Sequence, residues 1–393
     1  MSGKTFLALG VGLLLGFGLT LSVGADDTAL ERPGYALTTL DGSGNVGRFS
    51  SVTIGTDGLG LISSFDETNG DLKVAHCSNL TCTSATLTTV DRAGDVGQYS
   101  SVTIGADGLG LISYFDATNA DLKVAHCSDL ACTSSTLTTL TFLKSEDNDG
   151  QFTSVTSAGG RGVISYYDST DQILKLALCP DLACTEPTIT TTPDRAGNVG
   201  QYSSLTIGAD SLGLISYYDA TNGDLKVAHC SDSACTAATR TILDGAANNV
   251  GAPSSMIMGA DGFGLISYYD TTDGDLKVAH CSNLACTAAT RTTLQSEDNV
   301  GQYSSVTIGT DGLGLISYYD ATSGDLKVAH CSDLACTAAT LTTVDRAGDV
   351  GQYSSVTIGT DGLALISYYD ATNGDLKVAH CSDLFCVPYH RRH

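Results

Sequence analysis

The residues of this chain that could do chemistry recur as sets, and one set joins aromatic rings to carboxylates and amides. A Tyr-Tyr-Asp triplet or a near variant occurs seven times, as at Tyr217, Tyr218 and Asp219. A Gln-Tyr pair such as Gln302-Tyr303 stands earlier in several of the same segments. Tyrosine combines an apolar ring with a polar tip, and carboxylates and amides accept hydrogen bonds from hydroxyl groups. These sets therefore favour binding of a polyhydroxylated ligand such as a glycan.

The same residues also have an architectural interpretation. Tyrosines could fill the gaps between repeated units, and aspartates could cap turns by bonding their own backbone. Any residue that the fold requires must recur in every copy, so repetition itself favours this second interpretation, and both stay open. Neighbouring residues of a strand point to opposite faces, so at most one tyrosine of each pair is presented. The candidate ligand-binding residues are Tyr99, Tyr202, Tyr303, Tyr353, Gln98, Gln201, Gln302, Gln352, Asp116, Asp219, Asp320 and Asp370.

Cysteine forms the second repeated set, because each segment carries two cysteines separated by four residues. The pairs are Cys77 with Cys82, Cys127 with Cys132, Cys179 with Cys184, Cys230 with Cys235, Cys281 with Cys286, Cys331 with Cys336, and Cys381 with Cys386. An even count in an exported chain predicts disulfides, each within one hairpin. Zinc is the competing interpretation, since a histidine precedes most first cysteines, but the third segment has Leu178 there and four ligands are lacking. We predict no metal site.

The sequence singles out no catalytic arrangement, although the aspartates of the loop face leave an acid/base pair open. A catalytic site places acid, base or nucleophile in different environments, whereas these segments are near copies. The arginines are scattered, and no Ser-His-Asp or Cys-His set stands out. We predict a non-catalytic chain without a resident cofactor. Calcium is an alternative, because Asp320 and Asp325 flank one turn like a small oxygen cage, although the longer ligand series of a calcium loop is missing.

All of these sets belong to one unit that repeats seven times. The first cysteines, Cys77 to Cys381, follow one another at intervals of 50, 52, 51, 51, 50 and 50 residues. A period of this length with strand-like content predicts propeller blades. The least regular units are the third and the fifth, where an asymmetric function would lie. Their unusual residues are Arg161, Ile173, Leu178 and Pro180, and Ala252, Pro253, Met256 and Met258.

Each unit holds four strand candidates, which we name A to D. In the sixth unit they are Tyr303–Ile308, Leu313–Tyr319, Leu326–Cys331 and Thr340–Val344. They are rich in β-branched and aromatic residues, and Gly, Asp and Asn separate them. Dipeptides such as Asn222-Gly223 between B and C predict type I′ hairpin turns. In a propeller the D–A and B–C loops share one face, which would carry the candidate ligand-binding residues.

The two ends of the chain predict that the ring closes. The seventh unit stops at Cys386, where its strand D would begin, and residues 35–40 resemble the missing strand. Closure would protect sheet edges that an open array exposes. We therefore predict an all-β fold, a seven-bladed propeller of four-stranded antiparallel blades. The expected blades are residues 47–96, 97–149, 150–199, 200–250, 251–300, 301–350, and 351–393 with 34–42.

The ISYYD…NGDLKVA unit resembles the repeats of bacterial secreted propellers of the sialidase-like (BNR-like) group, over the whole mature chain. The resemblance implies the propeller fold and names no activity. The chain departs from the Asp-box form of that group, because the S-x-D-x-G-x-x-W pattern and tryptophan are both missing.

Residues 1–25 predict a secretory signal peptide. Lys4 gives a positive start, an apolar stretch follows to Leu21, and Val23-Gly24-Ala25 fits a cleavage site, with an uncleaved membrane anchor as the alternative. We expect a mature chain from Asp26 on, in the extracellular space or the periplasm. The formal charge of -24, from 19 Lys and Arg against 43 Asp and Glu, argues against nucleic acid or anionic membrane as partners.

These observations predict an exported, monomeric propeller that works as a binding or scaffold module. The leading hypothesis is multivalent weak binding of a glycan or polysaccharide on the face that carries the D–A and B–C loops. The alternative is a protein–protein adhesion or scaffold module that contacts a surface protein. A glycoside hydrolase or lyase is the second alternative.

Overall fold

The computed structural model describes residues 36–140, 148–185, 189–245 and 248–387, in which all regular elements are β-strands. The predicted signal peptide, residues 1–25, lies outside the described residues. Within the ranges given above, the structure contains no helix long and apolar enough to span a membrane.

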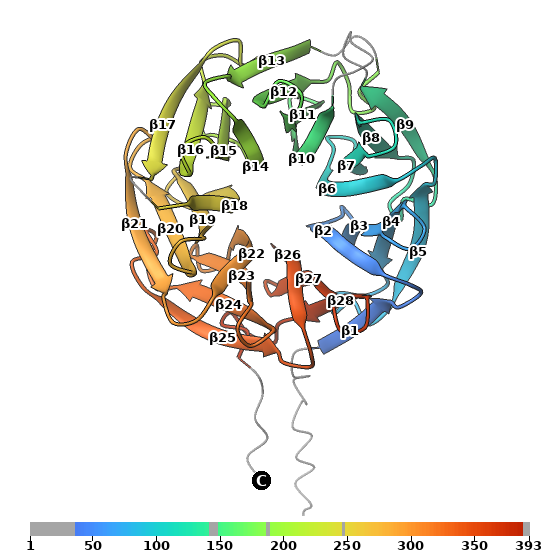
Figure 1. Cartoon of the computed structure of the whole chain (residues 1–393). Coiled ribbons are helices and arrows are strands. Elements are labelled where there is room, and N and C mark those ends of the chain that lie inside the picture. Colours follow the sequence, from blue (N-terminus) through green and yellow to red (C-terminus); the bar gives the residue numbers. More distant parts are fainter. Residues whose placement is uncertain (1–35, 141–147, 186–188, 246–247, 388–393) are drawn as a thin grey trace, which may run out of the picture. The chain divides into compact units, whose positions relative to one another are not determined.

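The strands of the described residues form seven four-stranded antiparallel sheets around a central axis, with strand A of each sheet innermost (Figure 1). The fold is therefore the seven-bladed propeller that the repeat period predicted.

We number the sheets as blades one to seven in chain order. Blades one to four consist of β2 (Val46–Ile54), β3 (Gly60–Asp66), β4 (Asp71–Cys77) and β5 (Ala85–Asp91); β6 (Val96–Ile104), β7 (Gly110–Asp116), β8 (Asp121–Cys127) and β9 (Ser135–Leu140); β10 (Asp149–Ala158), β11 (Arg161–Asp168), β12 (Ile173–Leu178) and β13 (Ile189–Asp194); β14 (Val199–Ile207), β15 (Gly213–Asp219), β16 (Asp224–Cys230) and β17 (Ala238–Asp244). Blades five to seven consist of β18 (Val250–Met258), β19 (Gly264–Asp270), β20 (Asp275–Cys281) and β21 (Ala289–Gln295); β22 (Val300–Ile308), β23 (Gly314–Asp320), β24 (Asp325–Cys331) and β25 (Ala339–Asp345); β26 (Val350–Ile358), β27 (Ala364–Asp370), β28 (Asp375–His380) and β1 (Ala36–Asp41).

The hydrophobic core lies between the blades. Both faces of each inner sheet region are covered by neighbours, so strand B is buried along nearly its whole length in every blade. Between blades one and two, Leu61 and Leu72 pack against Val102, Ile112 and Tyr114. Because apolar side chains gain free energy in proportion to the area removed from water, each junction stabilises the two blades that form it.

Serine hydroxyls join the inner strands of neighbouring blades. Ser354 of β26 donates to the carbonyl oxygen of Tyr303 in β22 at 3.0 Å, and the Ser305 hydroxyl accepts from the backbone N–H of Val356 at 3.2 Å. The junction between blades seven and one has the same contact, from Ser50 to the carbonyl oxygen of Tyr353 at 2.9 Å. The repeated Ser-Ser dipeptide therefore has an architectural role around the whole ring.

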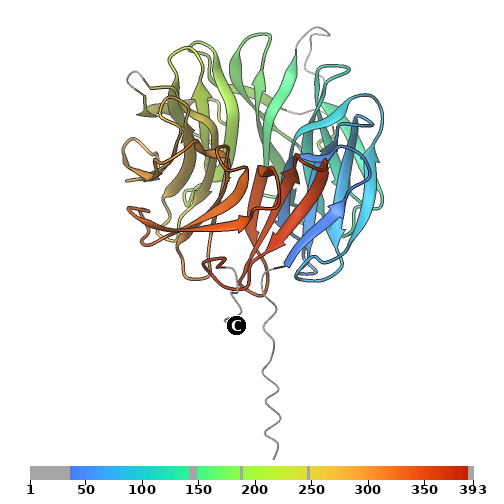
Figure 2. The ribbon, with the colours of Figure 1, turned by 60° about the horizontal axis from the view of Figure 1, so that its bottom comes forward.

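Strand β1 completes the seventh blade. It pairs antiparallel with β28, with Ala36 opposite His380 and Thr38 opposite Val378. Figure 2 shows the blue β1 beside the red strands of the blade formed by the other end of the chain. Every described sheet thus has four strands, and the order in the seventh is β26, β27, β28, β1.

The B–C turns differ from the sequence prediction of type I′ hairpins. In blade four the ladder ends at the pair Asp219 and Asp224, so four residues form the loop, and the N–H of Gly223 donates to the carbonyl oxygen of Asp219 at 2.8 Å. Gly223 has a φ of 75°, but Asn222 is not in the positive-φ region. A type I′ turn needs positive φ at both central residues, so that prediction was wrong and the glycine serves a longer turn.

The seven predicted disulfides are all present, each between cysteines five positions apart. Their Cα atoms lie 4.6–4.9 Å apart, and each bridge closes the C–D connection of its own blade. The described residues contain no free cysteine. Loop entropy gives each short bridge a contribution of about 2 kcal/mol. Seven bridges indicate a chain that folds in an oxidising compartment, as in the extracellular space.

Candidate functional site

Six aromatic residues near the start of strand A have a backbone conformation that non-glycine residues rarely adopt. They are Phe49, Tyr99, Phe152, Tyr202, Tyr303 and Tyr353, with φ between 52° and 54°. In β22 the register slips between Gln302 and Ser305, so a β-bulge holds Tyr303. Bulges re-aim a side chain locally, and a residue held at such a φ costs on the order of 1–3 kcal/mol.

These aromatic residues converge on the propeller axis. The ring centroids of neighbours lie 4.3–4.7 Å apart, from Tyr303 through Tyr353, Phe49, Tyr99 and Phe152 to Tyr202. Pro253 occupies the equivalent place in blade five and interrupts the series. Together with the serine or threonine that follows each of them, they line one open pocket of about 210 Å³, which we name the axial pocket. The four predicted tyrosines are therefore brought into one shared site.

One cation lies beside the axial pocket. Arg48 occupies the position that glutamine holds in most other blades, and it donates to the hydroxyl of Tyr353 at 2.9 Å. Its guanidinium carbon lies 5.4 Å from the centroid of the Tyr353 ring and 5.7 Å from that of Phe49, and it pairs with Glu67. The guanidinium makes the junction of blades seven and one chemically different from the rest of the pocket.

Burial in the pocket raises the pKa of the hydroxyls of Tyr99, Tyr202 and Tyr303, because the charged phenolate is poorly solvated there. The phenols therefore stay neutral hydrogen-bond donors at any physiological pH. In the described part of the chain, the Tyr99 and Tyr202 hydroxyls make no hydrogen bond to protein. Both groups are thus free to bond a ligand.

The second residue of each triplet belongs to an outer aromatic ring on the same face, and it is a tyrosine in five blades and Phe65 or Phe115 in the other two. The Tyr303 and Tyr319 ring centroids are 6.3 Å apart. The hydroxyl of Tyr319 donates to Asp349 in the next D–A loop at 2.6 Å, and Tyr269 donates to Asn299 in the same way. These tyrosines support the loops of the face, and their hydroxyls already have partners.

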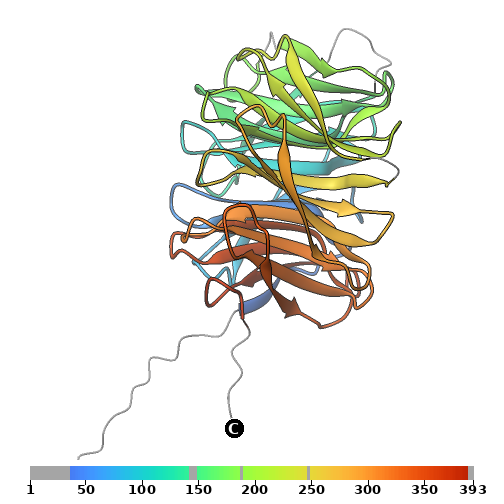
Figure 3. The same cartoon turned by 90° about the vertical axis from the view of Figure 1, so that its left-hand side faces the viewer.

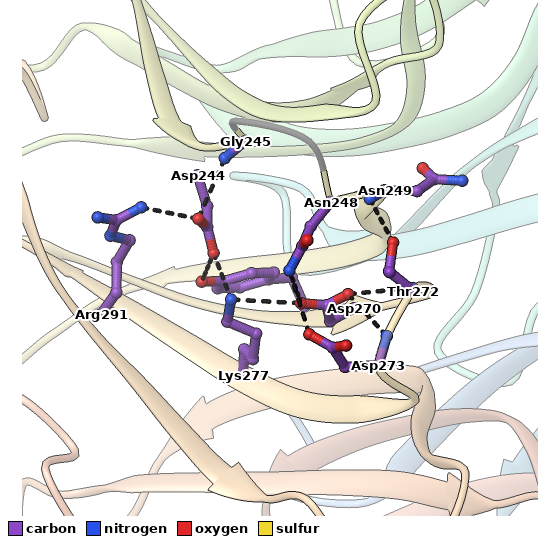
Figure 4. A network of polar contacts seen from close by, with 10 residues as sticks. Asp244, Gly245, Asn248, Asn249, Asp270, Thr272, Asp273, Lys277 and Arg291 are labelled. Carbon is purple, nitrogen blue, oxygen red and sulfur yellow. Dashed lines mark hydrogen bonds and ion pairs between the residues drawn. The ribbon is translucent and has the colours of Figure 1, made fainter.

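The first residue of the triplet, a tyrosine in every blade but the first, is buried between blades and is architectural. Tyr268 is fully buried, and its hydroxyl donates to Asp244 of the preceding blade at 2.8 Å. The same carboxylate pairs with Lys277 at 2.7 Å and with Arg291 at 2.7 Å. Figure 4 shows this network, which repeats with variations at most other junctions and joins strands B and C to the end of the preceding strand D.

The aspartates of the triplets lie under the surface. Asp116, Asp219, Asp320 and Asp370 are only 1–2% exposed. Each accepts hydrogen bonds from backbone N–H groups of its own B–C turn, as from Thr221 to Asp219 at 3.0 Å, and each lies near the lysine of strand C. Ligand binding by these four carboxylates stays a prediction, and their contacts are those of turn caps.

The four predicted glutamines lie on the face but outside the axial pocket. Gln98 donates to Asp95 at 3.2 Å, and Gln302 to Asn299 at 3.2 Å, with the same contact made by Gln201 and Gln352. Sequence reasoning missed Phe49, Phe152 and Arg48, because it selected tyrosine and glutamine by type. These three residues occupy the same positions in the repeat as the chosen tyrosines and glutamines. That equivalence was the signal that could have found them.

The histidines before the first cysteines contact carboxylates of the A–B loops on the opposite face. His229 Nε2 lies 2.8 Å from Asp210 Oδ2, and five other blades have the same pair at 2.8–2.9 Å. Figure 3 views the ring from the side, with the loops of the blades at its two faces. Within the described ranges no group of three or more His, Cys, Asp or Glu side chains is arranged to hold a metal ion. Calcium at the B–C turns stays a prediction.

No protein-family model matches this chain, and no curated protein matches it. Among solved structures, it is similar to a protein of unknown function from Dyadobacter fermentans at 12% identity and a TM-score of 0.56, over 88% of this chain and 99% of that one. It is also similar to hydrazine synthase of Kuenenia stuttgartiensis, at 12% identity and a TM-score of 0.56 over 84% and 95%. An α-L-arabinofuranosidase of Fusarium graminearum, in complex with an iminosugar inhibitor, matches at 10% identity and a TM-score of 0.50 over 88% and 97%. Likeness at these identities shows the propeller fold alone, and membership of the sialidase-like group stays a prediction.

Proposed function

We propose that this chain is a non-catalytic binding propeller that holds one sugar unit of a glycan in its axial pocket. The observation that carries the proposal is the strained aromatic series. Six blades hold an aromatic side chain at a φ of 52–54°, whereas blade five keeps the fold with Pro253 in the same place. A conformation that costs free energy and that the blade does not need is best explained by what the six rings do together.

The chemistry of the pocket supports binding rather than turnover. Its lining residues are aromatic, serine, threonine and proline, and none of them carries a carboxylate, imidazole or thiol. Aromatic faces and neutral phenol hydroxyls suit the apolar faces and hydroxyl groups of a sugar. The volume of about 210 Å³ is below the roughly 300–1,000 Å³ of common ligand sites, so we propose one sugar unit as the occupant.

The arrangement supports one site per chain in place of several equivalent weak ones. The aromatic rings contact one another, so a ligand on Tyr202 also meets Phe152. Avidity for a polymer would then require several chains rather than several blades. The similar α-L-arabinofuranosidase acts on a sugar, but the likeness is at the level of the fold and does not carry this proposal.

A glycan array probed with the mature chain tests the proposal, followed by titration calorimetry with the best glycan. Tyr202→Ala should weaken binding about fivefold, since one aromatic contact is worth about 1 kcal/mol, with little change in melting temperature. Tyr217→Phe in the same blade is the matched control. It removes a buried hydrogen bond to Asp194, so it should lower the melting temperature and leave glycan affinity unchanged.

Three results would contradict the proposal. Retention of no glycan above background would leave the scaffold interpretation. Loss of melting temperature without loss of affinity in Tyr202→Ala would make the aromatic series architectural. Release of sugar from the best glycan on incubation with the chain would make it a hydrolase or lyase.

A further inference from the structure

A second cavity lies between blades three and four, the green blades of Figure 1, away from the axial pocket. It has a volume of about 490 Å³, which is within the roughly 300–1,000 Å³ range of small-molecule sites. Its walls come from the A–B hairpin and strand C of blade three, and from strand A, the A–B loop and the disulfide of blade four. We name it the blade 3–4 cavity.

The cavity exists partly because Val163 replaces a leucine. At five other junctions, a leucine δ-methyl of the preceding blade packs against the glycine that opens strand B, 2.6–3.2 Å from where a Cβ would stand, as Leu61 does at Gly110. At Gly213 the corresponding residue of the preceding blade is Val163, and the nearest atoms belong to Cys230 and Leu205 of the same blade. The missing methylene leaves room beside the disulfide.

A second truncation opens the same space from blade four. Ser233 stands in the C–D loop where most other blades have leucine. In blade three the equivalent residue, Leu182, packs near Gly105 of the preceding blade. Ser233 cannot extend as far.

The A–B loop of blade three is the third contribution. Aligned with blade one, the loop is one residue shorter, and Ser157 replaces the isoleucine at the end of strand A. A Cβ on Gly159 or Gly160 would meet no atom within 4 Å. The shorter loop leaves room for Ser211, which has a φ of 65° where other blades carry glycine. Changes from three separate parts of the chain thus converge on one hollow.

The chemistry of the cavity has two parts. Val163, Leu176, Leu178 and Ile207 give it apolar walls. Arg161, also part of the lining, is exposed and replaces the leucine or phenylalanine of other blades, and the described residues offer it no ion-pair partner. The net charge of -24 makes the chain as a whole repel anions. The Arg161 guanidinium, in contrast, attracts an anion to this cavity.

We propose that the blade 3–4 cavity binds a small amphipathic carboxylate, with its apolar chain against the leucines and its carboxylate at Arg161. This site is separate from the axial pocket and independent of glycan binding. The repeat itself supplies the variant that removes it, because Val163→Leu with Ser233→Leu restores the residues that other blades carry.

Titration calorimetry of the full mature chain with decanoate, below its micelle concentration, tests the proposal. Decyltrimethylammonium, with the same chain and the opposite charge, is the ligand control. We expect decanoate to bind, the cation to bind more weakly, and Arg161→Gln to weaken decanoate about two- to fivefold. The filled double variant should lose at least about tenfold in decanoate affinity and keep or raise its melting temperature.

Met256→Val restores the repeat at the next junction, between blades four and five, and should leave decanoate affinity unchanged. Should the double variant fail to fold, Ser233→Leu alone, on an exposed loop, serves the same purpose. No binding of decanoate up to about 1 mM, equal binding of the cation, or undiminished binding in the filled variant would each overturn the proposal.

Discussion

At the scale of single residues, a buried carboxylate at the end of strand D joins two neighbouring blades at most junctions. Asp345 accepts from Lys377 at 2.6 Å and from the hydroxyl of Tyr368 at 2.8 Å. Burial alone would raise the pKa of this carboxyl, but the hydrogen bonds from Lys377, the backbone of Ala347 and Tyr368 outweigh it and hold the pKa below its usual value. At one junction Gln295 takes the place of the aspartate and accepts from Tyr318 at 2.7 Å.

Asp345→Ala should therefore lower the free energy of unfolding by about 3 kcal/mol, because it leaves Lys377 and Tyr368 without their acceptor. Asp345→Gln should cost only about 1 kcal/mol, since Gln295 shows that an amide can fill the place. Urea unfolding of both variants measures the difference. Equal losses in the two variants would mean that packing, rather than the acceptor, determines the cost.

At the scale of elements, ring closure depends on a strand from the other end of the chain. Without β1, strand β28 would present unpaired N–H and C=O groups to solvent. Deleting residues 26–41 should lower the melting temperature by at least about 5 °C and promote aggregation. Deleting residues 26–33 alone keeps β1 and should change neither property. A scan by calorimetry and a sizing column would show this, and an unchanged, monomeric 26–41 deletion would contradict it.

The elements were largely predictable from the sequence, and the contacts between them were not. The 50–52-residue period and the cysteine pairs predicted seven blades and seven bridges, because both signals lie within one unit. Tyr303 points toward the axis because it lies in a bulge with positive φ. Outside glycine, no residue type predicts such a φ from the sequence. The partner of Tyr114 is Asp91 in another repeat, so its burial could not be inferred from the triplet alone. Arg161 and Leu178 stood out in the sequence, but the meeting of Val163 with Ser233 needed the fold.

At the scale of the whole molecule, the ring contains two classes of aspartate whose pKa values are shifted in opposite directions. The carboxyls that end strand D, such as Asp91 and Asp345, have lowered pKa values, because lysine hydrogen bonds outweigh the effect of burial. Several that open strand C, such as Asp224 and Asp375, have pKa values raised by burial and by the nearby triplet aspartate. As the pH falls, the carboxyls with raised pKa values bind protons in the folded chain before they do in the unfolded chain. The carboxyls with lowered pKa values bind protons in the folded chain only at a lower pH than in the unfolded chain.

The sign of the stability change follows from these shifts. As the pH falls from 7 toward about 4, groups with raised pKa values bind protons in the folded state first, so stability rises. Below about pH 4 the unfolded chain protonates the carboxyls whose folded pKa is lowered, so stability is lost. The urea midpoint should thus peak at mildly acidic pH. Asp375→Asn should raise the midpoint at pH 7 and have a smaller effect near pH 4, while a midpoint that falls steadily from pH 7 would contradict the assignment.

The pairing of β1 with β28 also determines the order in which the blades can be completed during synthesis. Synthesis delivers the amino end first, so β1 emerges before any of the strands beside which it finally lies. Six sheets can form as soon as their own four consecutive strands are available, whereas the seventh must wait for the last. A chain interrupted anywhere before β28 therefore keeps an unpaired strand at its start and leaves the ring open. Only the finished polypeptide hides both, so the seam of the ring distinguishes complete molecules from fragments.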